Sequence, residues 1–368
     1  MAAPASKYDI RKVFSNFAVH GDFVTGAPYG SGHINDTFCV QTDQGGTPVR
    51  YILQRINHNI FKNPTGVMQN ILLVTEHLSR KIAENDKTRR ALRVIPARDG
   101  KPYHQDAEGN TWRAYVFVEK GIGYDAVETT AQAYEAAKAF GEFQCLLADL
   151  PASKLIEAIP NFHNTPWRFG NLEKAIAKDA LGRAKLCQKE IAFALARKDM
   201  CSKLLDLSAK GLVPQRITHQ DTKLNNVLLD FGTNEGICVI DLDTVGPGLV
   251  HYDFGDQVRT TTCKTREDEE DLSKVVFIMD MYEALVKGYL ETAKGFLTPT
   301  EIDNLYMAGR LMTFEVGIRF LTDFLEGDTY FKVAKENHNL IRCRTQFALV
   351  EQQEKLEPEM KAIVAKFR

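Results

Sequence analysis

The sequence predicts an α+β protein of two lobes: a small N-terminal lobe of antiparallel sheet with one helix, and a larger, mainly helical C-terminal lobe. Short β-rich segments separated by Gly, Pro and Asp dominate residues 1–120. Apolar residues spaced three and four positions apart dominate residues 121–368. We therefore expect one domain at 1–120 and a second at 121–368, and 44% hydrophobic content in 368 residues provides core material for both.

The N-terminal lobe is predicted to contain five strands and one helix. The strands are expected at residues 23–26, 35–41, 49–56, 92–96 and 112–119. Residues 42–46 (TDQGG) have the composition of a hairpin turn. The helix is expected at 66–84, because Val67, Ile71, Val74 and Leu78 recur on one face. Residues 120–123 (KGIG) are the best place for a hinge.

The C-terminal lobe is predicted to be helical with one short β-rich insertion. Helices are expected at residues 130–150, 172–180, 187–207, 273–290 and 300–325. The insertion covers residues 216–229 and 236–245, where short apolar runs flank a polar segment. The polar segment between these apolar runs is therefore the first candidate for a functional site.

Composition excludes several classes of function. The 46 Lys and Arg against 48 Asp and Glu leave a net charge of −2, so no nucleic-acid partner is expected. The seven cysteines form no CxxC pair or zinc pattern. No apolar run approaches the roughly 18 residues of a membrane span, and residues 1–14 lack a signal-peptide core. We expect a cytoplasmic protein with no membrane contact and no obligate protein partner.

The decisive motif is THQDTKLNNVLL at residues 218–229, of the form H-x-D-x-K-x-x-N before an apolar strand. Asp241 ends a second apolar strand 15 positions after Asn226. These two pieces resemble the catalytic loop and the metal-binding strand end of protein kinases. Phosphoryl transfer needs one carboxylate beside the acceptor hydroxyl, which Asp221 would orient and deprotonate. Asn226 and Asp241 would hold Mg²⁺, and Lys223 would reach the γ-phosphate of ATP.

Four further residues near this motif have supporting roles or are candidates for the metal site. His219 is expected to hold the loop through a hydrogen bond rather than to act in catalysis. Asp253 and Asp256 are expected to brace the loop and the C-terminal helices. Asp243 lies two residues after Asp241 and would point the same way on a strand, so it is a candidate third carboxylate of the metal site.

Further segments make the chain resemble a known family over nearly its whole length. They are YGSGHIN at 29–35, YILQ at 51–54, FHNTP at 162–166, IDLDT at 240–244, DFGD at 253–256, RFL at 319–321, LEGDTYF at 325–331 and HNL at 338–340. With these motifs the chain resembles the aminoglycoside phosphotransferase and choline kinase superfamily, and within it the N-acetylhexosamine 1-kinases. The resemblance implies a protein-kinase-like fold, ATP and Mg²⁺ as cofactors, and transfer of phosphate to the anomeric hydroxyl of an N-acetylhexosamine.

The resemblance also implies which residues contact the acceptor. Asp221 would touch the reacting hydroxyl, and His33, Arg319 and Tyr330 would hold the sugar ring. Each of the last three has a plainer interpretation. His33 could be an ordinary histidine in a turn. Arg319 could form a salt bridge with Glu315 or Asp323. Tyr330 could be a partly buried aromatic residue at a helix end.

Nucleotide contacts are expected in the N-terminal lobe, with one departure from the kinase pattern. The expected contacts are Gly30, Ser31, Gly32, Gln54 and Glu119. The glycines would let backbone N–H groups approach the phosphates. The third strand of kinases usually carries a phosphate-binding lysine, and here Gln54 takes that position. The loss puts the usual Lys–Glu pair in doubt.

Two alternatives stay open at this point. An enzyme of the same fold could act on another hexose, an amino alcohol or an aminoglycoside. The protein could instead be a non-catalytic nucleotide-binding module, which the missing strand lysine favours and the retained Asp221, Lys223, Asn226 and Asp241 oppose.

Overall fold

The structure, a computed structural model, describes residues 8–30, 32 and 34–368, and it contains two compact units. The first unit comprises the chain up to Asp125 together with Ser153–Ile159 and Val227–Gly246. The second comprises Ala126–Ala152, Pro160–Asn226 and Pro247–Arg368. The sequence analysis places a single boundary at 120/121, whereas the first unit also takes two later segments. The second half of the predicted β-rich insertion therefore packs with the first unit.

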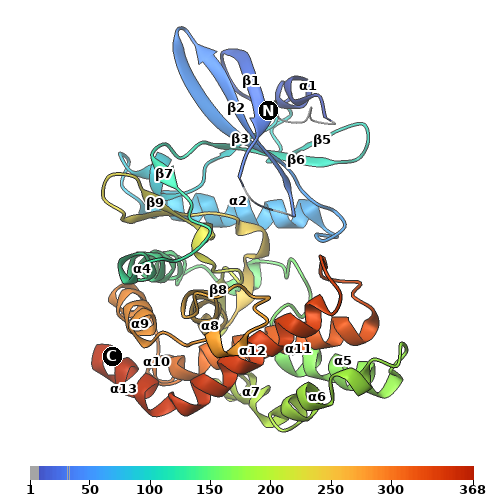
Figure 1. The fold of residues 1–368 in the computed structure, drawn as a ribbon. Coiled ribbons are helices and arrows are strands. Elements are labelled where there is room, and N and C mark those ends of the chain that lie inside the picture. The colour runs from blue at the N-terminus through green and yellow to red at the C-terminus, as the bar shows by residue number, and fades with distance from the viewer. Residues whose placement is uncertain (1–7, 31, 33) are drawn as a thin grey trace. The chain divides into compact units, whose positions relative to one another are not determined.

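An antiparallel sheet forms the centre of the first unit (Figure 1). Its strands run in the order β1-β2-β3-β6-β4, with β5 paired to β6. Their bounds are β1 Asp22–Pro28, β2 Asp36–Gln44, β3 Thr47–Arg55, β4 Val94–Ile95, β5 His104–Gln105 and β6 Thr111–Val116. One face of the sheet packs with α1 (Ile10–Phe14) into an apolar core that contains Phe38, Leu53 and Trp112. The predicted α+β class and the predicted strands are confirmed.

The hairpin between β2 and β3 turns at the predicted glycines. Gln44 pairs with Thr47, so Gly45 and Gly46 alone form the turn. Their φ angles of 65° and 88° match a type I′ turn, which only residues tolerant of positive φ adopt readily.

The helix α2 (Pro64–Lys81) confirms the periodicity prediction, and its buried face includes Val67, Ile71, Val74 and Leu78. Asn63 caps it by accepting from Gly66 N. A short helix, α3 (Lys87–Arg90), follows. A second small sheet has the order β10-β9-β7, with β7 Gly121–Ile122, β9 Val227–Asp230 and β10 Gly236–Val239. The segment predicted as a hinge thus contains a short strand paired with β9.

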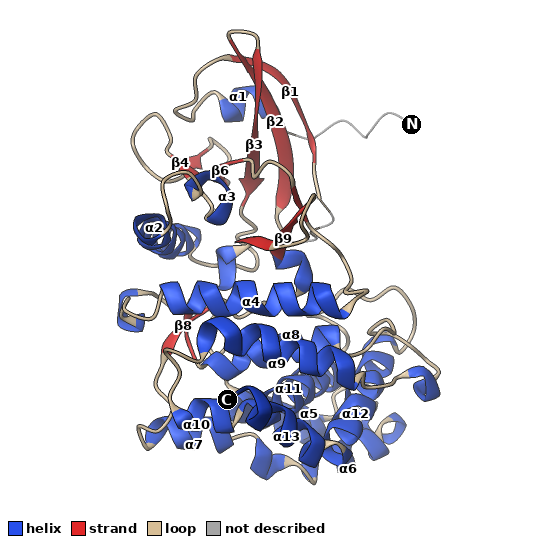
Figure 2. Ribbon diagram, turned by 90° about the vertical axis from the view of Figure 1, so that its left-hand side faces the viewer, coloured by secondary structure: helices blue, strands red, loops and turns tan. Residues whose placement is uncertain are grey.

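The second unit is mainly helical (Figure 2). Its α-helices are α4 Thr130–Leu146, α5 Thr165–Lys178, α6 Gln188–Leu195, α7 Lys203–Ala209, α8 Val250–Thr261, α9 Met279–Ala293, α10 Pro299–Asp303, α11 Leu305–Glu326, α12 His338–Lys355 and α13 Glu357–Phe367. Helix α4 packs along α9, and α11 packs against α5, α8 and α12. The strand β8 (Arg216–Thr218) pairs with β11 (Gly246–Gly248).

Two helical predictions need correction. The helix expected at 187–207 is two helices, α6 and α7, separated by a 3₁₀ turn at Lys198–Met200. The helix expected at 300–325 is divided between α10 and α11 at Asn304. In the β-rich insertion predicted at 216–229, residues 219–226 form a loop and a 3₁₀ turn between the strands β8 and β9. Helices α8, α12 and α13 were not predicted. Within the described residues, no helix combines the length and the apolar character required to cross a bilayer.

Candidate active site

The loop that carries Asp221 is held by a buried carboxylate on α8. Asp253 accepts hydrogen bonds from the backbone N–H groups of His219 and Gln220, both at 2.8 Å. Gln220 has φ +69°, an unfavourable conformation for a residue with a Cβ. Such a conformation persists where the surroundings fix it. Asp253 therefore imposes the bend that precedes Asp221.

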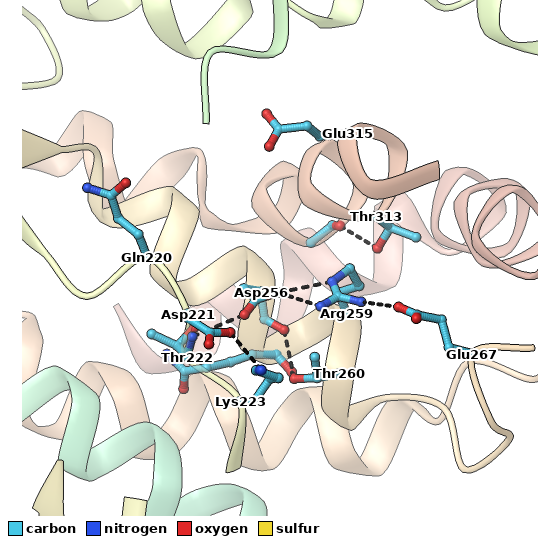
Figure 3. Close-up of polar contacts among 12 residues, drawn as sticks. Gln220, Asp221, Thr222, Lys223, Asp256, Arg259, Thr260, Glu267, Thr313 and Glu315 are labelled. Carbon is cyan, nitrogen blue, oxygen red and sulfur yellow. Dashed lines mark hydrogen bonds and ion pairs between the residues drawn. The ribbon is translucent and has the colours of Figure 1, made fainter. Parts of the chain in front are cut away.

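A second carboxylate of α8 fixes the residue after Asp221 (Figure 3). Asp256 accepts from Thr222 N at 3.0 Å, and Thr222 Oγ1 donates to the carbonyl of Asp253 at 2.6 Å. Arg259 pairs with Asp256 at 2.9 Å and with Glu267 at 3.2 Å. The expected bracing role of Asp253 and Asp256 is confirmed.

His219 has the structural environment predicted for it. Its side chain is fully buried, and its ring meets Phe140 and Phe143 of α4 edge to face. Its Nδ1 accepts from Asp221 N at 3.3 Å. The imidazole thus supports the backbone of the loop at Asp221.

The loop brings together three of the predicted site residues. Lys223 Nζ lies 3.1 Å from Asp221 Oδ1, and the two side chains are 42% and 27% exposed. Asn226 Nδ2 donates to the carbonyl of Asp221 at 2.7 Å and to its Oδ2 at 3.3 Å. Both bonds use the nitrogen of the Asn226 amide, so its oxygen is the atom suited to a hard cation such as Mg²⁺.

Asp241 and Asp243 belong to the first unit and differ in environment. Asp241 follows β10 with φ 59° and ψ 56°, a left-handed conformation. Asp243 is buried, and its carboxylate accepts from Arg113 through one oxygen and from Asn35 through the other at 2.6 Å. Arg113 balances the charge of Asp243, and a role for this carboxylate as a third metal ligand stays a prediction. The pairing of Asp241 with Asn226 around Mg²⁺ stays a prediction.

The structure describes four of the five expected nucleotide contacts. Gly30 has φ +80°, and a Cβ at Gly30 or Gly32 would meet no atom of the described residues within 4 Å. Ser31 and His33 lie outside the described residues. Glu119 is exposed and forms a two-point ion pair with Arg50.

Gln54 bonds across the sheet at both ends of its amide. Its Nε2 donates to Thr37 Oγ1 at 3.0 Å, and its Oε1 accepts from Arg113 Nε at 2.9 Å.

Arg319 of α11, an expected sugar contact, lies among aromatic rings. Its guanidinium carbon is 5.4 Å from the ring centroid of Phe162, 5.8 Å from that of Tyr330 and 5.6 Å from that of Phe331. Among residues 8–30, 32 and 34–368, Arg319 forms no ion pair within 4.0 Å. The salt-bridge interpretation of Arg319 is therefore not supported.

The two carboxylates proposed as partners of Arg319 have other roles. Asp323 accepts from the backbone N–H groups of Thr329, Tyr330 and Phe331 at 2.8–2.9 Å. This fixes the backbone of the loop after α11 while the Tyr330 side chain stays 57% exposed. An exposed ring on a rigid backbone suits contact with a ligand.

Arg168, on α5, is a functional candidate that the sequence analysis missed. Its Nε and Nη2 donate to the carbonyl of Phe162 at 3.3 and 3.2 Å, so both arginines contact Phe162. Burial, and then the positive charge of Arg319, lower the pKa of Arg168 to about 10. An arginine on an amphipathic helix is indistinguishable in sequence from a solvated one, so only its neighbours reveal it.

Glu315 links the segment with His163 and Thr165 to the loop that carries Asp221. It accepts from Thr165 Oγ1 at 2.6 Å and bonds His163 Nδ1 at 2.8 Å. His163 Nε2 in turn bonds the carbonyl of Gln220 at 3.0 Å. Burial alone would raise the pKa of Glu315, but the charge and hydrogen bond of His163 hold it below its usual value.

We expect Glu315→Gln to lower the free energy of unfolding by about 3–5 kcal/mol at pH 7, because it breaks a buried pair. A lowered carboxyl pKa contributes stability above the unfolded value of 4.5 and loses it as pH falls through the folded pKa. The difference between wild type and variant should therefore shrink below about pH 4.5. Urea unfolding between pH 7 and 3.5 measures it. The exposed Glu351→Gln on α12 is the control, expected within about 0.5 kcal/mol; a constant difference across this pH range would contradict the assignment.

The chain is similar to one protein family in sequence and to several solved structures in fold. Residues 25–284 match the sequence family described as "Phosphotransferase enzyme family". A microcompartment-associated aminopropanol kinase has a similar structure, with 15% identity, a TM-score of 0.63, and coverage of 95% of this chain and 97% of that one. An aminoglycoside phosphotransferase from Alicyclobacillus acidocaldarius has 11% identity, the same TM-score, and coverage of 100% and 98%. Spectinomycin phosphotransferase, solved with ADP and spectinomycin, has 15% identity, a TM-score of 0.52, and coverage of 90% and 94%. These similarities confirm the protein-kinase-like fold.

Proposed function

This chain belongs to the phosphotransferase enzyme family, and we propose that it transfers the γ-phosphate of ATP to the anomeric hydroxyl of an N-acetylhexosamine. The observation that carries the choice of acceptor is the cluster around Arg319, which lies against the rings of Phe162, Tyr330 and Phe331. A sugar offers hydroxyl groups and an apolar ring face, so planar hydrogen-bond donors beside aromatic surfaces suit it.

The loop residues take complementary roles in the proposed reaction. Asp221 orients the acceptor hydroxyl and receives its proton. Lys223, 3.1 Å from that carboxylate, supplies positive charge for the transferred phosphate. Asn226 fixes Asp221 through its Nδ2. Transfer then depends mainly on position and charge, as expected for phosphoryl groups.

Asn226 and Asp241 are the residues we propose to hold Mg²⁺, since amide and carboxylate oxygens are its preferred protein ligands. Bound there, the ion would neutralise negative charge on the phosphates. We propose that the glycine-rich segment with Gly30, Ser31 and Gly32 contacts the phosphates through its backbone, and that His33, Arg319 and Tyr330 contact the sugar. The spectinomycin phosphotransferase complex with ADP supports nucleotide use.

The charge on the acceptor side opposes the alternative of a cationic acceptor. Amino alcohols and aminoglycosides carry protonated amines at neutral pH. Arg168 and Arg319 both contact Phe162, and the pKa of Arg168 is already lowered by burial and by its neighbour's charge. A further cation would add repulsion there, and such repulsion discriminates between ligands. A neutral hexose meets no such penalty.

The test is to incubate the protein with ATP, Mg²⁺ and each of N-acetylglucosamine, N-acetylgalactosamine, glucose, galactose, ethanolamine, choline and an aminoglycoside, and to identify products by mass spectrometry and phosphorus NMR. We expect 1-phosphates from the N-acetyl sugars, and turnover of the cationic acceptors at least 100-fold lower. Turnover of only another acceptor would overturn the sugar assignment and keep the kinase. ATP binding without any turnover would favour the non-catalytic module.

A further inference from the structure

Three strands of the first unit place one polar row across the face of the sheet opposite its apolar core. The register sets Thr37 of β2 opposite Gln54 of β3, and Gln54 opposite Arg113 of β6. Directly opposed residues share a face, and hydrogen bonds join all three side chains. Gln54 is therefore a neutral bridge at the position where kinases usually carry the phosphate-binding lysine.

The positive charge of this row is on Arg113. Its side chain is 1% exposed, and a buried cation requires an anion close by. Asp243, 3% exposed, supplies it by accepting from Arg113 Nη1. Burial opposes the charged form of Arg113, yet the charge and hydrogen bond of Asp243, with smaller effects of its other neighbours, raise its pKa above the ordinary value. The other Asp243 oxygen accepts from Asn35 Nδ2 at 2.6 Å.

The turn that contains Asp243 begins at Asp241 in a left-handed conformation, which is unfavourable for any residue with a Cβ. It is fixed on both sides. Asp243 is held by Arg113 and Asn35, and the end of the turn is held by α2, where Asn70 Nδ2 donates to the carbonyl of Val245 at 3.0 Å. The contacts that hold Asp243 and Val245 therefore help to set the conformation of Asp241.

We propose that Arg113 supplies a buried cation beside the position of the missing strand lysine, and that it is a positioning residue rather than a phosphate ligand: through Asp243 it sets the turn that presents Asp241 to Mg²⁺. The inference rests on the proposed function, because it concerns the metal and nucleotide of that same site. It moves Gln54 from a direct nucleotide contact to a spacer that aligns Arg113 with the sheet.

Loss of Arg113 should affect nucleotide binding differently in the presence and in the absence of Mg²⁺. Arg113 acts on Asp241 and not on the nucleotide itself. Its loss should therefore reduce the increase in ADP affinity that Mg²⁺ produces. A merely structural role would weaken ADP binding with and without Mg²⁺ alike. Isothermal titration with ADP, in EDTA and in saturating Mg²⁺, measures both and needs no acceptor.

Arg113→Met alone would leave Asp243 buried and unpaired, so the variant of choice is Arg113→Met with Asp243→Asn, which removes both charges. We expect this double variant to fold cooperatively and to bind ADP in EDTA with an affinity within about threefold of wild type. The factor by which Mg²⁺ raises its ADP affinity should be at least about tenfold smaller than in wild type. A second variant combines Arg113→Met with Gln54→Lys and keeps Asp243. It returns a cation to the polar row, and it should recover most of the increase in ADP affinity that Mg²⁺ gives wild type.

The matched control is Arg55→Met with Asp36→Asn, which removes an ion pair between β3 and β2 of the same sheet. Its gain from Mg²⁺ should equal that of wild type. A folded Arg113/Asp243 double variant that keeps the full gain would overturn the assignment of Arg113. Intact Mg²⁺-dependent ADP binding in wild type, without phosphorylation of any sugar, would overturn the proposed acceptor and leave Arg113 in place.

Discussion

Asp221→Asn is expected to reduce kcat by about 10²–10⁴-fold, the range typical for loss of a positioned general base. The amide can still hydrogen-bond the acceptor hydroxyl but cannot receive its proton. The KM for ATP should change little, because nucleotide contacts are proposed for other residues. Steady-state kinetics with a coupled ADP assay measures both parameters.

The fold should tolerate this change. The backbone around Asp221 is held by Asp253 and Asp256, and the Asp221 carboxylate is partly exposed, with Lys223 as its ion-pair partner. An exposed pair contributes at most about 1 kcal/mol. Asp199→Asn, an exposed aspartate of the same unit, is the control. A variant at Asp221 that retains more than a tenth of wild-type kcat would remove this residue from the role of base.

The sequence predicts the site best where its residues are close together in the chain. Asp221, Lys223 and Asn226 lie within six positions, so a single loop brings their side chains into contact, and the structure confirms that contact. Arg113 and Asp243 are 130 positions apart, and their pairing follows only from the sheet register and the turn after β10. No local pattern could have identified Arg113 as the partner of Asp243.

Helix α8 shows why part of the fold could not be predicted. Its residues from Val250 to Val258 are all buried, including His251, Asp253, Asp256 and Gln257. A helix in a core normally shows an apolar stripe and a polar face, so polar side chains through this stretch obscured the pattern. Their burial is stable because Asp253 and Asp256 satisfy the N–H groups of a distant loop. The polar residues that obscure the helical pattern of α8 in the sequence are thus the ones that hold the loop with Asp221.

Asp253→Asn is expected to be strongly destabilising, by as much as Glu315→Gln. The fully buried carboxylate accepts from His219 N, Gln220 N and Gln144 Nε2 at 2.6–2.8 Å. An amide replaces one of its two acceptor oxygens with a donor that faces N–H groups. Each buried donor left unsatisfied costs about 1–3 kcal/mol, so a loss of roughly 3–5 kcal/mol is expected. That is a large part of the stability of a typical domain.

The loss should fall on the catalytic loop as well as on the fold, because the bend at Gln220, with φ +69°, depends on Asp253. Amide hydrogen exchange should show His219, Gln220 and Asp221 losing protection well before the core of α11, with kcat reduced even at temperatures where the variant is folded. Asp280→Asn, in the first turn of α9 as Asp253 is in the first turn of α8, is the matched control and should leave both measurements near wild type. If the loop and α11 exchanged together, the bend would be a property of the whole unit, and Asp253 would be an ordinary core residue rather than the residue that shapes the loop.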